Sequence, residues 1–193
     1  MRKLSSADEL QQAESAFRAV FARVSSTDPF QPRLGARLLL YPIDYTLLDA
    51  AQFEAVATAS IHAGVERPYF AGYGGEEAGW GGTYGHRLVD VRSYDDYRYD
   101  DDGFLIIEHF LFAPRGECAL VTSYGEYAIV AGTETFLDDL RSAMGYDEVR
   151  ALGDLVSDWR EIGHGGGSVE WVPRLLNHVL GAGKGPRLWE RSS

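Results

Sequence analysis

The sequence predicts an α+β domain in which helices at both ends of the chain flank a mostly antiparallel sheet. Near the N-terminus, apolar residues recur at the spacing of an amphipathic helix, and this spacing returns after Gly132. Between these regions lie short aromatic and β-branched runs, separated by turns that contain glycine and proline. A run of strands bounded by helices is typical of this fold class. The chain has 193 residues, so we expect one domain over residues 1–181 and a loose tail over residues 182–193.

The first predicted helix covers residues 5–25. Ser6 and Glu9 have the spacing of a capping box, in which each side chain accepts a backbone N–H of the first turn. The apolar residues that follow fall on one face of the helix: Leu10, Ala13, Phe17, Val20, Phe21 and Val24. Beyond two prolines, the pattern predicts a strand over residues 36–43 and a second helix over residues 44–63.

The middle of the chain is predicted to supply most of the sheet. Aromatic and β-branched residues indicate strands over residues 67–73, 86–94, 104–112, 118–124 and 127–132. Pro114 and Gly116 provide the turn between two of these strands. Two further stretches are predicted as loops. One is glycine-rich, over residues 74–85, and the other is the acidic "SYDDYRYDDDGF", over residues 93–104.

Helical spacing resumes after the last strand. Thr133 is placed to cap a helix over residues 133–144, which Gly145 ends. A longer helix is predicted over residues 146–163, followed by the loop "HGGGS" and a last helix over residues 169–181.

Composition narrows the class of protein. Hydrophobic residues make up 45% of the chain, which is ordinary for a folded domain. The N-terminus has no apolar run typical of a signal peptide, and no stretch approaches the roughly 18 apolar residues of a membrane span. The single cysteine, Cys118, excludes an internal disulfide framework. We therefore expect a cytoplasmic protein without a membrane partner.

Negative charge is concentrated in the middle of the chain. The formal net charge is −11, and residues 51–160 carry twenty acidic but only eight basic side chains, which accounts for the whole excess. Nucleic acid is disfavoured as a direct partner, because phosphate binding needs positive charge. An acidic surface favours a basic protein partner instead, although such charge also serves solubility alone.

Several motifs that resemble catalytic or metal sites are incomplete. The acidic stretch fails as a helix–loop–helix calcium site, because Arg98 and His109 occupy the first and twelfth ligand positions. "HGGGS" resembles an esterase oxyanion-hole motif, but the chain has no G-x-S-x-G nucleophile elbow. "GAGKGP" lacks the first glycine and the hydroxyl residue of a phosphate loop. The scattered histidines have no helical metal-site spacing, so we expect no metal and no cofactor.

Two chemical alternatives remain open in the sequence. Cys118 and His109 could lie side by side on adjacent strands as a nucleophilic pair, in one of two possible registers. Glu76, Glu77 and Asp90 could supply paired carboxylates for glycoside hydrolysis.

Candidate partner-binding residues gather in the acidic and glycine-rich stretches. Tyrosine offers rigid contact area at low entropic cost, and carboxylates attract basic side chains. Trp80 lies between glycines, so its ring has little local packing and could anchor a partner. The predicted contact residues are Tyr94, Asp95, Asp96, Tyr97, Tyr99, Asp100, Asp101, Asp102, Glu76, Glu77 and Trp80.

Residues 109–140, "HFLFAPRGECALVTSYGEYAIVAGTETFLDDL", resemble a pattern in bacterial immunity proteins of polymorphic toxin systems, including SUKH-like ones. There, a strand ending in F-x-P-x-G leads to a serine-bearing strand, an A-I/L-V-x-G strand and a helix that opens T/S-x-x-F. The resemblance implies a cytoplasmic inhibitor that binds and neutralises a basic toxin such as a nuclease. The five aspartates would then face its arginines and lysines. The alternatives are an adaptor subunit of a larger bacterial assembly and a small carboxylate-dependent hydrolase.

Overall fold

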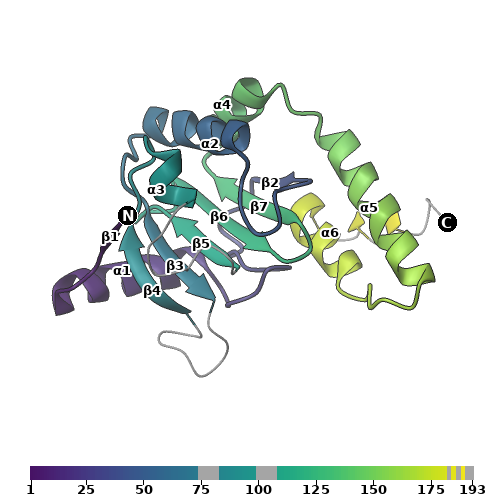
Figure 1. Ribbon diagram of the computed structural model, residues 1–193, viewed down its shortest axis with the longest axis horizontal. Helices are drawn as coiled ribbons and strands as arrows, with labels where there is room; N and C mark the ends of the chain where they lie inside the picture. Colours follow the sequence, from purple (N-terminus) through teal and green to yellow (C-terminus); the bar gives the residue numbers. More distant parts are fainter. Residues whose placement is uncertain (74–82, 99–107, 182–183, 186–187, 190–193) are drawn as a thin grey trace.

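Figure 1 shows the chain as a computed structural model that describes residues 1–73, 83–98, 108–181, 184–185 and 188–189. Within these residues the chain forms six helices and one seven-stranded sheet, and helices lie toward both ends of the chain. All neighbouring strands pair antiparallel, which confirms the predicted α+β class.

The sheet is built mainly from consecutive strands of the middle of the chain. In spatial order, its strands are β1 (Arg2–Lys3), β4 (Thr83–Leu88), β3 (Tyr69–Tyr73), β5 (His109–Phe112), β6 (Cys118–Ser123), β7 (Tyr127–Gly132) and β2 (Arg37–Leu40). The two edges are formed by strands from the N-terminal region, since β1 pairs with β4 and β2 pairs with β7. The N-terminal region therefore supplies both edge strands of the sheet.

Helices cover both faces of this sheet. One face carries α2 (Ala50–His62), α3 (Tyr94–Arg98) and α4 (Glu134–Met144). The other face carries α1 (Ala7–Val20), α5 (Glu148–His164) and α6 (Val172–Leu180). The result is three layers, with the sheet between two sets of helices.

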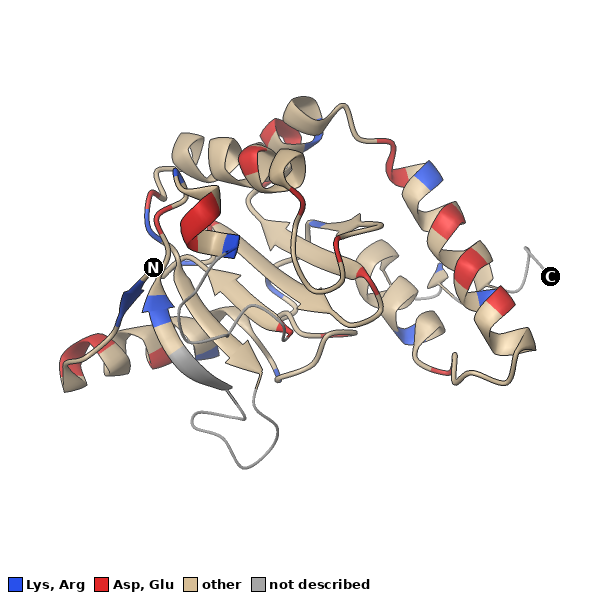
Figure 2. Ribbon diagram, in the orientation of Figure 1, with Lys and Arg blue, Asp and Glu red and all other residues tan. Residues whose placement is uncertain are grey.

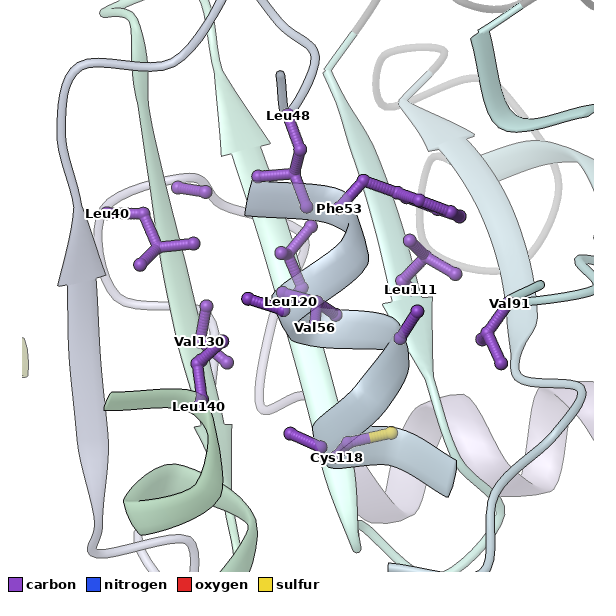
Figure 3. Packing of buried hydrophobic residues seen from close by; sticks show 14 of the residues in the cluster. Leu40, Leu48, Phe53, Val56, Val91, Leu111, Cys118, Leu120, Val130 and Leu140 are labelled. Carbon is purple, nitrogen blue, oxygen red and sulfur yellow. The ribbon is translucent and has the colours of Figure 1, made fainter. Parts of the chain in front are cut away.

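Side-chain alternation along the strands divides the core into two clusters. On β5, Leu111 packs toward α2, whereas its neighbours Phe110 and Phe112 pack toward α1. We call the cluster toward α2 the first and the cluster toward α1 the second. Figure 3 shows the first cluster, in which Phe53 and Val56 of α2 lie over side chains of the central strands. Both faces are buried, which explains why the strand sequences are apolar almost throughout instead of alternating with polar residues.

Local signals account for most helix ends. Ser6 and Glu9 form the predicted capping box of α1, and Asp49 caps α2 through the Gln52 N–H. Thr133 caps α4 as predicted. Gly145 ends that helix with φ of 57°, a left-handed conformation that glycine adopts without steric cost.

The structure differs from the sequence prediction in several places. The second helix, expected over residues 44–63, begins only at Ala50. The strand expected over residues 86–94 is β4, Thr83–Leu88, and β1 was not predicted at all. Residues 94–98, expected in a loop, form α3. In the tail expected to be loose, Trp189 packs under the Arg160 guanidinium, with 4.9 Å from the guanidinium carbon to the ring centroid. Leu188 and Trp189 are partly buried against the second cluster, so these residues are docked.

Candidate protein-binding surface

The predicted contact residues fall into two groups. Seven of them lie outside the described residues: Glu76, Glu77, Trp80, Tyr99, Asp100, Asp101 and Asp102. The other four, Tyr94, Asp95, Asp96 and Tyr97, form most of α3. Asp95 and Asp96 are exposed, and Tyr94 is half-buried. The described part of the acidic stretch therefore presents carboxylates to solvent from a short helix.

Tyr97 is fully buried, so its prediction as a partner contact is wrong. Its ring stacks on Phe53 of α2, with centroids 4.7 Å apart. The Leu48 N–H donates to Tyr97 Oη at 3.2 Å, and the same oxygen lies 2.9 Å from His109 Nε2. Burial raises the pKa of Tyr97 above its usual value, so the phenol stays neutral. Tyr97 thus anchors α3 to the sheet and turns the two aspartates outward.

The buried His109 continues this polar chain into the sheet. Its backbone N–H donates to Thr122 Oγ1 at 3.0 Å, and its Nδ1 lies 3.1 Å from the same oxygen. The Phe70 ring stacks on the imidazole. Both ring nitrogens therefore have partners inside the protein, which gives His109 a structural role.

The pairing of Cys118 with His109, which the sequence left open, does not occur, and Cys118 is a buried free cysteine. His109 bonds to Thr122, and Cys118 lies four residues from Thr122 along β6, which corresponds to roughly 13 Å. Burial raises the pKa of the Cys118 thiol to about 11. A protonated thiol remote from a base is a poor nucleophile.

An exposed aromatic pair lies beside α3, at the end of the sheet where β6 turns into β7. Tyr45 follows β2 and has φ of 61°, and its side chain is 50% exposed. Tyr124 lies in the β6–β7 turn and is 48% exposed. The two rings meet edge to face, with centroids 5.4 Å apart. The Arg98–Asp44 ion pair, at 3.2 Å, ties the Tyr45 segment to α3.

Carboxylates surround this pair. Glu108 Oε1 accepts the Ser123 hydroxyl at 2.9 Å and the Tyr124 N–H at 3.1 Å. Glu126 is exposed, with φ of 56°, and its carbonyl accepts the Ile43 N–H at 2.8 Å. We call the resulting set the tyrosine–carboxylate surface: Asp44, Tyr45, Glu108, Tyr124 and Glu126. Its backbone is fixed by hydrogen bonds, so the two rings are held in place before any partner arrives.

The negative surface continues onto α5. The Tyr41 hydroxyl donates to Asp158 Oδ2 at 2.7 Å. Burial, then the charges of Asp158, Glu126 and Asp154, raise the pKa of Tyr41 above its usual value. Figure 2 shows acidic residues on α3, on α5 and in the segment between β2 and α2. The tyrosine–carboxylate surface is thus part of a wider acidic region.

Sequence reasoning missed Tyr45 and Tyr124. A turn signal was present for Tyr124, since "SYGE" separates two strand patterns, but nothing in the sequence indicated its contact with Tyr45. Within the described residues, no three His, Cys, Asp or Glu side chains gather in a way that could hold a metal ion. None of the described helices combines the length and apolarity that a bilayer crossing requires.

Comparison of the chain with protein-family models, with curated proteins and with solved structures finds no match.

Proposed function

We propose that this chain is a non-enzymatic inhibitor that binds a basic protein in the bacterial cytoplasm, as an immunity protein neutralises its toxin. The observation that carries the proposal is the exposed Tyr45–Tyr124 pair among Asp44, Glu108 and Glu126. Tyrosines provide the large, rigid contact area that is enriched at protein interfaces. Carboxylates around them attract and orient arginine and lysine side chains.

The charge of the whole chain supports the same kind of partner. A net charge of −11 attracts a basic protein over a distance and repels nucleic acid. The exposed Asp95 of α3 adds to the negative field of this region, whereas Asp96 lies 3.6 Å from the Met1 ammonium and Asp44 pairs with Arg98. A toxin that acts on nucleic acid needs a basic surface, and covering that surface would block its substrate.

The first test isolates the partner with matched baits. Wild-type protein, the double variant Tyr45→Ala/Tyr124→Ala and the control variant Val149→Ala are used as baits against an extract of the source bacterium. Val149 is 82% exposed on α5, so its truncation removes apolar surface outside the tyrosine–carboxylate surface. We expect one basic protein to be retained by the wild type and the control but depleted from the double variant.

The second test uses that protein in purified form. Loss of two aromatic anchors should weaken the affinity by about 30-fold or more. Raising the salt from about 0.1 to 1 M should also weaken binding, because the screening length falls from roughly 10 to 3 Å. Expressed alone, the partner should arrest growth, and co-expression with the wild-type chain should restore it.

Three results would contradict this proposal. Undiminished affinity of the double variant would remove the tyrosine–carboxylate surface from the interface. A partner that stays bound at high salt and is harmless when expressed alone would indicate an adaptor subunit instead. A retained partner with an acidic surface would contradict the electrostatic argument.

A further inference from the structure

A second surface of opposite charge lies at the other side of the molecule from α3. A hollow of about 480 Å³ opens between the segment after α1 and helix α6. Its charged lining consists of Arg23, Arg37 and Arg174, with Asp28 as the carboxylate among the described residues. His178 and Asn177 of α6 complete its polar wall. An excess of guanidinium groups is unusual in a chain whose net charge is −11.

Arg37 is held in the wall of this hollow by backbone acceptors. Its Nε–H donates to the Leu34 carbonyl at 3.1 Å, and its Nη1–H donates to the His178 carbonyl. Burial lowers the pKa of Arg37 from its ordinary value, but an arginine side chain stays charged at neutral pH. Carbonyl oxygens orient the guanidinium without neutralising its charge. These two hydrogen bonds, made to described residues, use Nε and Nη1 of Arg37. They leave Nη2 for another acceptor.

Asp28 does not balance this charge, because Arg23 already pairs with it. The Arg23 Nη1 and Asp28 Oδ2 atoms are 3.3 Å apart. Asp28 Oδ1 also accepts the Ser25 hydroxyl at 2.9 Å. Within the described part of the chain, no carboxylate pairs with Arg37 or with the exposed Arg174. Two positive charges therefore remain at the hollow.

The imidazole of His178, in the lining of the hollow, is neutral. Its Nε2 accepts the Phe30 N–H at 3.3 Å, and its ring stacks on Phe30, with centroids 5.8 Å apart. Burial and the neighbouring Arg37 lower the pKa of His178 to about 4. Since Nε2 is an acceptor in the neutral ring, the proton must be on Nδ1. The neutral imidazole thus adds no negative charge to the lining.

We propose that this hollow binds a small phosphate group, as inorganic phosphate or as a phosphate monoester. Two guanidinium groups match the two charges of such a dianion, and their planar N–H donors match its oxygens. The surrounding negative charge disfavours a long polyanion, so the ligand is a small molecule and not nucleic acid. The volume of about 480 Å³ is sufficient for a phosphate with a small organic substituent.

The test is calorimetric titration of the full chain with inorganic phosphate and with phenyl phosphate, at constant ionic strength and neutral pH. Acetate serves as the monoanionic control. The variant Arg174→Ala removes an exposed guanidinium of the hollow, and Arg150→Ala removes one from α5, where its side chain is 79% exposed. Loss of one charge-assisted contact should weaken phosphate binding about tenfold in Arg174→Ala. Arg150→Ala should bind like the wild type.

Saturable binding of both phosphates, weakened by Arg174→Ala alone, supports the proposal. If phenyl phosphate binds but inorganic phosphate does not, the hollow recognises the ring, and the proposal is overturned. Equal binding of acetate, or no saturation well above about 1 mM phosphate, also overturns it. Partner binding through the tyrosine–carboxylate surface should be unchanged in Arg174→Ala, so the two proposals can fail separately.

Discussion

The two faces of the sheet are equally closed to water but are held in different ways. Toward α1, the contacts are almost entirely aromatic and aliphatic, with Phe17, Phe21 and Phe110 in mutual ring contact. Toward α2 and α3, an apolar cluster encloses the polar chain of Tyr97, His109 and Thr122. The first face depends on shape and volume. The second also depends on hydrogen bonds that have no water to replace them.

The largest expected effect comes from truncating an aromatic side chain on the face of the sheet toward α1, which we call the aromatic face. Phe110 is 1% exposed and meets Phe17 and Phe21 edge to face, with centroids 5.4 and 5.1 Å away. Phe110→Ala should lower the free energy of unfolding by about 3–5 kcal/mol, measured by urea denaturation. Phe110→Leu keeps most of the volume and should cost clearly less. Equal losses in the two variants would show that ring volume does not govern this face.

On the face toward α2 and α3, the contribution of the polar chain to stability is tested by removing a single hydroxyl oxygen. Tyr97→Phe keeps the ring but leaves the Leu48 N–H and His109 Nε2 without this partner. We expect the free energy of unfolding to fall by about 1–3 kcal/mol, because buried polar groups lose a hydrogen bond. Tyr41→Phe is the control, since its hydroxyl bonds to Asp158 at the surface, and it should change stability by about 0.5 kcal/mol or less. If Tyr97→Phe left the free energy of unfolding unchanged, the polar chain would add nothing to stability.

The pH dependence of stability tests the environment of His178, which lies at the edge of the aromatic face. Its pKa is lowered from 6.5 to about 4, so between these values the unfolded chain binds more protons than the folded one. Stability should therefore fall as the pH falls from 6.5 toward 4. The contribution of His178 to this slope should be below about 1.4 kcal/mol per pH unit, because one group binds at most one extra proton in the unfolded chain.

The comparison that isolates His178 is between unfolding curves of the wild type and His178→Gln across this pH range. Glutamine can accept the Phe30 N–H but does not titrate, so the variant should show a shallower slope. His86, whose pKa is also lowered to about 4 by burial, contributes equally to both proteins and cancels. Identical slopes in wild type and His178→Gln would contradict the assignment.

The smallest effect is expected outside both faces. Tyr45 and Tyr124 are each about half exposed, and their rings contact each other. Tyr45→Ala/Tyr124→Ala should lower the free energy of unfolding by about 1 kcal/mol or less. Thermal denaturation would check this, and a larger loss would mean that the pair supports the fold.

Much of this fold could be predicted from the sequence, because its signals are local. Caps such as Ser6 and Thr133 and the turn at Gly116 fix where elements begin and end. The helix α3 had such a signal too, since Ser93 Oγ accepts the Asp96 N–H at 3.1 Å in an N-cap arrangement. The density of aspartates obscured it. The strand pattern that follows, over residues 104–112, predicted a loop for this stretch.

The candidate site was harder to predict, because burial there depends on distant residues. Tyr97 is surrounded in sequence by charge, and only its contacts with Leu48 and His109 make it a core residue. Conversely, Tyr45 and Tyr124 are separated by a long stretch of chain and meet only through the pairing of β2 with β7. Composition indicated an acidic, tyrosine-rich surface. It could not indicate which tyrosines face solvent.

The pairing of β2 at one edge of the sheet has a consequence for how the protein behaves among its own copies. A long, flat outer strand offers unpaired backbone groups that can template cross-β aggregation. Here β2 spans only Arg37–Leu40, three of its four residues are buried, and α5 and α6 lie against it. Its first residue is a charged arginine whose guanidinium is bonded to backbone carbonyls. The short length of β2, its burial and the charged Arg37 therefore disfavour strand addition by a second molecule at this edge.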